Sequence, residues 1–166
     1  HRFKPVFPEP EALVGRVARL VGTDGNAKMS KSRGNTIELR ESADSVAKKV
    51  KSMYAGPPRG ATDPGKVDEN PIFLYLDAFD PNPAEVAELK ATYEKTGLPN
   101  KILKDRLTDV LNTKLEPFRE RRAQYEANMP LVKEALEAGT QRMRKVSLET
   151  MDMVRDALDM NYLGRY

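Results

Sequence analysis

Apolar residues recur at helical spacing over most of this chain, beginning near residue 41. In the first such segment Ser42 or Ser45 can cap a helix, because a serine hydroxyl accepts a hydrogen bond from a free backbone N–H group. Gly56-Pro57-Pro58 ends this helix, since proline cannot continue it. Residues 59–69 are rich in Gly, Pro, Asp and Lys and predict a long exposed loop. The apolar face of the predicted helix comprises Val46, Val50, Met53 and Tyr54.

Caps and periodicity predict three more helices before residue 130. Asn70-Pro71 opens a short, strongly apolar helix to Phe79, with asparagine as the cap and proline at the first helical position. Asn82-Pro83 repeats this start, with a glutamate three residues after the cap, and that helix stops near Gly97. Pro117 is expected to bend or break the third helix late. The apolar positions of the third helix are Leu103, Leu107, Val110, Leu111 and Phe118.

A long helix is predicted from Pro130 to about Met160. Its apolar positions alternate steps of three and four residues, a spacing typical of helix packing, and small residues among them predict close approach of a neighbouring helix. Residues 41–166 are therefore expected to form a helical bundle. The stripe consists of Leu136, Gly139, Met143, Val146, Thr150, Met153, Ala157 and Met160.

Residues 1–40 have a different pattern. The two prolines of Phe7-Pro8-Glu9-Pro10 exclude a helix interior. Two short apolar runs, Leu13-Val14 and Val17–Val21, are bounded by glycines and predict strands. The pattern therefore places a domain boundary near residue 40.

Composition narrows the class of protein. With no cysteine in 166 residues the chain has no disulfide and no Cys-based zinc site. No apolar run reaches the roughly 18–20 residues of a membrane span, so we expect a soluble, cytoplasmic protein. The first residue is His1 rather than Met, and no helix start signal follows, so we expect a piece of a longer protein. Asp77, Asp80, Asp105 and Asp109 are joined by no His or Cys, and we predict no metal site from them.

Positive charge concentrates near the start of the chain. Residues 1–40 hold 8 Lys or Arg and 4 Asp or Glu, which leaves 20 basic and 21 acidic residues of the totals of 28 and 25. The surplus surrounds Lys28-Met29-Ser30-Lys31-Ser32. Ammonium groups neutralise phosphate oxygens while hydroxyl and backbone N–H groups donate hydrogen bonds, so this loop can close on a polyphosphate. A given five-residue string occurs by chance in such a chain on the order of once in 10,000, which disfavours an ordinary polar turn.

The pentapeptide resembles the signature loop of class I aminoacyl-tRNA synthetases, which clamps ATP during amino-acid activation. The segments that resemble tryptophanyl-tRNA synthetases in particular are Arg33–Ile37, Phe7–Leu13, Asn70–Phe73, Tyr75–Phe79 and Glu116–Arg122. The resemblance implies a mainly α chain with two parts. Residues 1–40 would be the C-terminal end of a Rossmann-like nucleotide-binding α/β domain, and residues 41–166 a helical-bundle anticodon-binding domain that contacts tRNA.

The same resemblance implies roles for the loop residues. Lys28 and Lys31 are the expected catalytic and ATP-binding cations, assisted by Mg²⁺. Ser30 and Ser32 would supply hydroxyls to ATP, and Met29 would pack the loop onto the domain beneath. When the amino-acid carboxylate attacks the α-phosphate, negative charge builds on the leaving pyrophosphate, and two cations can stabilise it.

The family's other signature, a His-Ile-Gly-His segment, has no counterpart here, because His1 is the only histidine. The tryptophan pocket of such enzymes also lies upstream of the matched part. The piece is therefore expected to hold half of an ATP site and to be inactive alone. The family is typically homodimeric through its catalytic part, so the piece itself can be a monomer.

Two alternatives stay open at the level of sequence. A tyrosyl-tRNA synthetase shares the architecture and the lysine loop, and a stand-alone helical RNA-binding or interaction module would lack an enzymatic parent. Tyr93, Tyr125, Tyr162 and Tyr166 could stack on RNA bases, although tyrosine at helical spacing is more often part of a core. The candidate contacts to tRNA are two basic clusters: Arg119, Arg121 and Arg122, and Arg142, Arg144 and Lys145.

Overall fold

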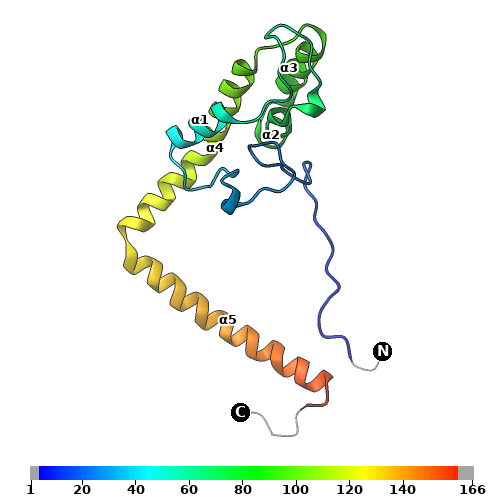
Figure 1. Ribbon diagram of the computed structural model, residues 1–166. Helices are drawn as coiled ribbons and strands as arrows, with labels where there is room; N and C mark the ends of the chain where they lie inside the picture. The colour runs from blue at the N-terminus through cyan, green and yellow to red at the C-terminus, as the bar shows by residue number, and fades with distance from the viewer. Residues whose placement is uncertain (1–3, 161–166) are drawn as a thin grey trace. The chain divides into compact units, whose positions relative to one another are not determined.

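The computed structural model describes residues 4–160, and all regular secondary structure in that range is helical (Figure 1). The mainly α fold class is confirmed. The elements in chain order are η1 (Lys31–Arg33), α1 (Ala43–Ser52), η2 (Val67–Glu69), α2 (Pro71–Phe79), α3 (Pro83–Lys95), α4 (Asn100–Ala127) and α5 (Met129–Ala157).

The chain divides into two compact units. The core unit spans Val14–Ala123, and the terminal unit consists of His1–Leu13 with Gln124–Tyr166. The core unit holds α1, α2, α3 and most of α4, whereas the terminal unit holds α5. The two predicted tyrosine contacts at Tyr162 and Tyr166 lie outside the described residues.

The strands predicted at Leu13-Val14 and Val17–Val21 are wrong. A strand needs a neighbour for its ladder of hydrogen bonds, and no segment between residues 4 and 160 supplies one. The carbonyl of Val21 instead accepts a hydrogen bond from the hydroxyl of Tyr75 at 2.5 Å. Short apolar runs bounded by glycine are therefore not sufficient to predict a strand.

Helix starts in the core unit follow the predicted caps. Ser42 is the cap of α1, and its hydroxyl accepts a hydrogen bond from the Ser45 N–H at 3.2 Å. Asn70 caps α2 by accepting from the Ile72 N–H at 3.1 Å, with Pro71 at the first helical position. At the start of α3 the Asn82 carboxamide bonds to Glu85 at 3.2 Å and not to the backbone.

One hydrophobic core joins the helices of the core unit. Phe73 of α2 meets Tyr93 of α3 edge to face, with ring centroids 5.0 Å apart. Asn70 donates to the Tyr93 hydroxyl at 3.2 Å, so the polar end of this buried ring is satisfied. The buried members are Val46 and Val50 of α1, Met53 and Ala55 after it, Ile72, Phe73, Tyr75 and Leu76 of α2, Val86 and Tyr93 of α3, and Leu103, Leu107, Leu111 and Leu115 of α4.

Arg59 fixes the loop predicted over residues 59–69, because its side chain contacts both the loop and the residues around α3. Its guanidinium donates to the Asp63 carbonyl at 2.6 Å and to the Leu98 carbonyl. The same group lies 4.2 Å from the centroid of the Tyr93 ring. One arginine thus holds an otherwise polar loop against α3, and the loop ends in the short helix η2.

The helix α4 continues through Pro117 to Ala127, so a break at this proline does not occur. In α5 the predicted bounds are close to the observed ones, but no residue of α5 is buried. Within the described residues, the apolar stripe of α5 therefore has no buried member, and its part in a core stays a prediction. The space beside Gly139 is open, and a Cβ added there would meet nothing within 4 Å. No helix within residues 4–160 is long and apolar enough to cross a membrane.

Candidate functional site

The predicted lysine loop lies in the core unit between two short backbone turns. In the first turn the Gly22 N–H donates to the Asn26 carbonyl at 2.8 Å, and the Gly25 N–H donates to the Gly22 carbonyl at 2.9 Å. Gly25 has a φ of +81°, a conformation that favours glycine. In the second turn the Gly34 N–H donates to the Lys31 carbonyl at 3.0 Å and closes η1.

The two sides of the loop are joined at Asn35. Its carbonyl accepts from the Thr23 N–H at 2.9 Å. Its side-chain oxygen accepts from the Ser30 N–H at 2.9 Å, and its side-chain nitrogen donates to the Lys28 carbonyl at 2.9 Å. The same nitrogen donates to an Asp24 carboxylate oxygen at 2.9 Å. Only 3% of Asn35 is exposed, so these bonds are shielded from water.

Asp24 is the acceptor at the centre of this turn. Its pKa is lowered by hydrogen bonds from the Asn26 side chain, then the Asn35 side chain and the Asn26 backbone N–H. Asn26 reaches the carboxylate through its side chain at 2.7 Å and its backbone N–H at 3.0 Å. Asp24 therefore stays ionised and keeps its oxygens available as acceptors.

The ammonium groups of the two lysines take no part in this network. Lys28 and Lys31 are exposed, and among residues 4–160 neither ammonium group has a hydrogen-bond or ion-pair partner. The hydroxyls of Ser30 and Ser32 lie 3.2 Å apart. Met29 is partly buried and packs against the hydrophobic core. The loop thus presents two cations and two hydroxyls to solvent, which is the chemistry of an anion site.

Three hydrogen bonds connect the backbone beside this loop to α1, to the segment that follows α1 and to α2. The Tyr54 N–H donates to the Thr23 carbonyl at 2.9 Å, and Lys49 of α1 donates to the Thr36 carbonyl at 2.7 Å. Tyr75 of α2 donates to the Val21 carbonyl. Burial, with a smaller contribution from the negative charge of Asp24, raises the pKa of Tyr75 to about 12, so this hydroxyl stays a donor at neutral pH.

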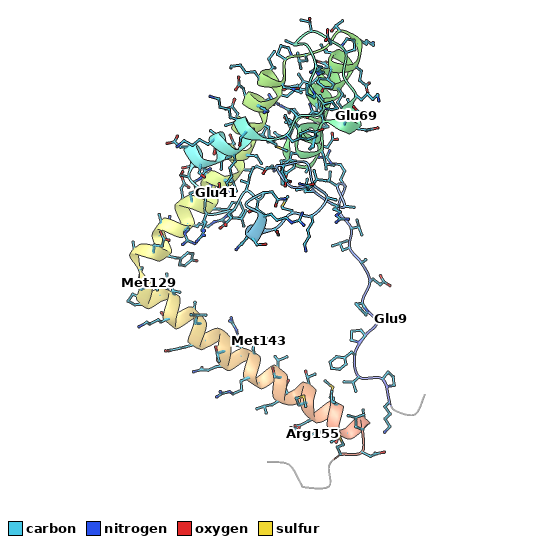
Figure 2. All side chains as sticks on the ribbon, viewed as in Figure 1. Glu9, Glu41, Glu69, Met129, Met143 and Arg155 are labelled. Carbon is cyan, nitrogen blue, oxygen red and sulfur yellow. The ribbon has the colours of Figure 1, made fainter. Side chains whose placement is uncertain are left out.

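Glu41, labelled in Figure 2, connects the segment after the loop to α1 through its carboxylate and to α4 through its backbone carbonyl. Its carboxylate accepts from Lys49, from the Glu38 N–H at 2.9 Å and from the Ser45 hydroxyl at 2.9 Å. Burial alone raises the pKa of Glu41, but these three donors outweigh burial and lower it. A charged carboxylate at this position therefore stabilises the start of α1.

The first basic cluster proposed for tRNA is largely engaged within the protein. Arg119 donates to the Glu41 carbonyl at 2.8 Å and to the Asn112 side chain at 2.6 Å, and only 15% of its side chain is exposed. The Arg121 guanidinium lies 5.0 Å from the centroid of the Phe118 ring. Of the second cluster, Arg142, Arg144 and Lys145 are all exposed on α5. The sequence does not distinguish Arg119 from the cations of the second cluster. In the structure Arg119 is bound within the protein, whereas the second cluster is exposed.

The aspartates considered as metal ligands are mostly ion-paired. Asp77 binds Lys90 at 2.6 Å, and Asp105 binds Lys101 at 2.5 Å. Asp80 binds Arg106 at 2.8 Å. Within residues 4–160 no three His, Cys, Asp or Glu side chains gather in a way that could hold a metal ion.

Sequence reasoning identifies the loop but not the asparagine that joins its sides. In the sequence Asn35 stands out only as part of the segment that follows the lysines. A usable signal in the sequence is the pair Gly34-Asn35, because glycine there permits the left-handed conformation that the structure shows. The Asn35 side chain then bonds to Asp24. A short side chain with both donor and acceptor groups is common where a turn closes.

Comparison with known proteins gives consistent matches. A family model described as tRNA synthetases class I (W and Y) matches residues 1–116. The chain is 46% identical over 157 residues to the tryptophan–tRNA ligase of Treponema pallidum, covering 94% of the chain and 47% of that ligase. It is 41% identical over 164 residues to the corresponding ligase of Clostridium longisporum, covering 97% of the chain and 48% of the ligase. The chain thus spans about half the length of the curated relatives it matches.

Solved structures match as well. The tryptophanyl-tRNA synthetase of Campylobacter jejuni, in complex with ADP and tryptophan, matches with a TM-score of 0.71 and 29% identity over 87% of the chain and 44% of that structure. The tyrosyl-tRNA synthetase of Archaeoglobus fulgidus, in complex with L-tyrosine, has a TM-score of 0.50 and 28% identity, covering 61% of the chain and 35% of that structure. The match to the tryptophan enzyme extends over more of the chain.

Proposed function

The chain belongs to the class I tRNA synthetases of the tryptophan and tyrosine group, and from this membership we propose that it is part of a tryptophan–tRNA ligase. Such an enzyme activates tryptophan with ATP and transfers it to tRNA. The observation that carries the proposal is the exposed, unpaired pair Lys28 and Lys31, held on a fastened loop. This pair supplies the positive charge that the departing pyrophosphate requires.

The loop residues take distinct parts in this reaction. Lys28 and Lys31 bind the ATP phosphates and stabilise the charge that develops on pyrophosphate. Ser30 and Ser32 donate hydroxyl hydrogen bonds to phosphate oxygens, and Met29 holds the loop on the core. Mg²⁺ supplies further positive charge at the phosphates when it is bound. The loop's own contribution is to place its donors where charge develops.

Residues 1–40 and 41–166 are proposed to serve two domains. Residues 1–40 would complete the Rossmann-like ATP-binding domain, and the exposure of the apolar side chains of Phe7 and Leu13 supports a covering domain there. Residues 41–166 would form the helical domain that contacts the anticodon region of tRNA. Arg142, Arg144 and Lys145 are better placed for RNA than Arg119, because they are exposed on α5. The absence of cysteine fits a cytoplasmic enzyme.

Tryptophan is favoured over tyrosine as the amino acid. The tryptophan–tRNA ligases matched by the chain are 41–46% identical to it, and the match to the tyrosine enzyme has the lower TM-score. The stand-alone module is disfavoured because it leaves the lysine pair without a role.

The test is ATP–pyrophosphate exchange by the complete ligase, with tryptophan and tyrosine compared. We expect Lys31→Ala to lower kcat about 100- to 1,000-fold, as removal of one transition-state donor does. Lys48→Ala is the matched control, because Lys48 is an exposed lysine of α1 outside the loop. Unchanged exchange in Lys31→Ala would overturn the enzymatic role of the loop, and a preference for tyrosine would overturn the choice of amino acid.

A further inference from the structure

We propose that Asn35 is the positioning residue of the lysine loop, because its buried carboxamide fastens the backbone on both sides of Met29 to the Asp24 turn. The inference rests on the proposed function, since it assigns Asn35 to the placement of Lys28 and Lys31 against ATP. It adds a residue outside the pentapeptide, one that touches neither cation's ammonium group.

Both donor hydrogens and the acceptor oxygen of the Asn35 carboxamide are engaged in hydrogen bonds. The carboxamide nitrogen has two hydrogens, and the structure gives them two acceptors, the Lys28 carbonyl and the Asp24 carboxylate. The carboxamide oxygen accepts from the Ser30 N–H. No other side chain of this length both donates twice and accepts. Aspartate would place a second carboxylate beside Asp24. Alanine would remove the side-chain partner of the Ser30 N–H and of the Lys28 carbonyl, while Asp24 would keep its bonds from Asn26.

The backbone so fastened is the backbone that carries the cations. Lys28 is bound through its carbonyl and Ser30 through its N–H, while the side chain of Met29 between them packs on the core. Three attachments in three consecutive residues fix the path of the chain, and the lysine side chains remain exposed. An arrangement of this kind confines the cations before ATP arrives, which lowers the ordering cost in the transition state.

Gly22 is the second part of the arrangement. A Cβ at this position would lie 2.2 Å from the Asn35 side-chain nitrogen and 2.5 Å from an Asp24 oxygen. Any larger residue must therefore displace the carboxamide or the carboxylate. At Gly15, by contrast, nothing lies within 4 Å of a Cβ, so Gly15→Ala is a matched control for Gly22→Ala.

The fastening is tested directly in the chain of 166 residues by amide hydrogen exchange. We expect Asn35→Ala to abolish protection of the Ser30 N–H while circular dichroism shows unchanged helix content. Asn26→Ala is the control, because Asn26 also bonds to Asp24 but makes no side-chain bond to residues 28–30. Ser30 protection that survives Asn35→Ala would overturn the proposed fastening.

The positioning role is tested by kinetics of the complete ligase. We expect Asn35→Ala and Gly22→Ala to lower kcat for pyrophosphate exchange about 100-fold, as a misplaced catalytic group does, with the KM for tryptophan unchanged. Gly15→Ala should match the unmodified enzyme. A residue needed only for folding would lower the amount of active enzyme and the melting temperature, and would leave kcat per folded molecule unchanged.

A double-mutant cycle separates this inference from the proposed function. If Asn35 acts through Lys28 and Lys31, Asn35→Ala costs less in a Lys31→Ala background than alone. Fully additive effects would overturn the inference while leaving the function intact, as would a kcat unaffected by Asn35→Ala when Lys31→Ala lowers it. A Lys31→Ala enzyme with unchanged kcat would overturn the proposed function and the ATP role of Asn35 together.

Discussion

The core unit and α5 contain similar apolar residues but use them differently. Leucines at positions 103, 107, 111 and 115 of α4 are buried in a shared core, whereas no residue of α5 is buried. Both segments show helical periodicity in the sequence, and both are helices in the structure. Periodicity therefore predicts helix formation and the face that can pack, while burial depends on whether a partner covers that face.

The difference has an energetic consequence for each region. In the core unit, helix stability comes mainly from packing, so helix and core form together. In α5, within the described residues, stability depends on local terms such as the Asn128 cap, which accepts from the Leu131 N–H at 3.3 Å. Matched substitutions in the two regions should therefore change stability by different amounts, and in one case in opposite directions.

The largest difference is expected for a leucine in each helix. Leu107 is fully buried, and Leu136 is 65% exposed. Leu107→Ala should lower the free energy of unfolding by about 2–5 kcal/mol, because apolar contacts are lost and a cavity remains. Leu136→Ala should change it by less than about 0.5 kcal/mol. Urea denaturation followed by circular dichroism measures both, and a loss at Leu136 close to that at Leu107 would show that the α5 stripe is covered in solution.

An arginine ion pair in each region gives a second, smaller contrast. Arg106 binds Asp80 through two nitrogens, at 2.8 and 3.1 Å, and the Asp80 side chain is fully buried. Arg155 binds Asp152 at 3.2 Å with both side chains about half exposed. Arg106→Ala should cost about 2 kcal/mol, since it leaves a buried carboxylate without its cation. Arg155→Ala should cost less than about 1 kcal/mol.

The pH dependence checks the cause of the Arg106 effect. The hydrogen bond from Arg106 lowers the pKa of Asp80 in the folded protein, against the opposing effect of burial. The resulting stability is present above the unfolded-state pKa of about 3.9 and is lost as pH falls through the lower folded-state value. Denaturation measured between pH 7 and pH 2 should show that the free energy of unfolding falls less steeply with decreasing pH in Arg106→Ala than in the unmodified protein. An equally steep loss would assign the acid sensitivity to other carboxylates.

Replacement of each of two glycines by alanine is expected to change stability in opposite directions. Gly97 has a φ of +75°, and a Cβ there would lie 2.4 Å from the Asp63 carbonyl oxygen, so Gly97→Ala should lower stability by about 1–2 kcal/mol. Gly139 lies within α5 with open space around it. Gly139→Ala should therefore stabilise α5 by about 0.5–1 kcal/mol. Thermal melts report the first change and helix content the second, and a loss of helix in Gly139→Ala would indicate a close neighbour at this position.

Much of the helical part of the fold could be predicted from local signals. Ser42 and Asn70 are predictable as caps because their side chains can accept from free N–H groups, and the structure places them there. Gly97 is predictable as the end of a helix, and it follows the cap residue of α3. These signals succeed because caps act over three or four residues and need no distant partner.

The features that escape prediction depend on distant residues. The segment Val17–Val21 looks like a strand, but a strand requires a second segment, and its Val21 carbonyl bonds to Tyr75, 54 residues away in the sequence. Arg119 looks like a surface cation until Glu41 supplies its acceptor, 78 residues away. The lysine loop is recognisable from its own residues, whereas the role of Asn35 emerges only when Asp24, Lys28 and Ser30 are brought together.

The hydrogen bonds that connect the lysine loop to the helices have a mechanical consequence. Thr23 and Thr36 are bound to Tyr54 and Lys49, and Val21 is bound to Tyr75, so both ends of the loop are attached to one body. A rigid rotation of that body displaces Lys28 and Lys31 through the same angle and preserves the separation of their backbone positions. The two lysine backbones are therefore placed by the orientation of the core unit, and not by an independent movement of the loop ends.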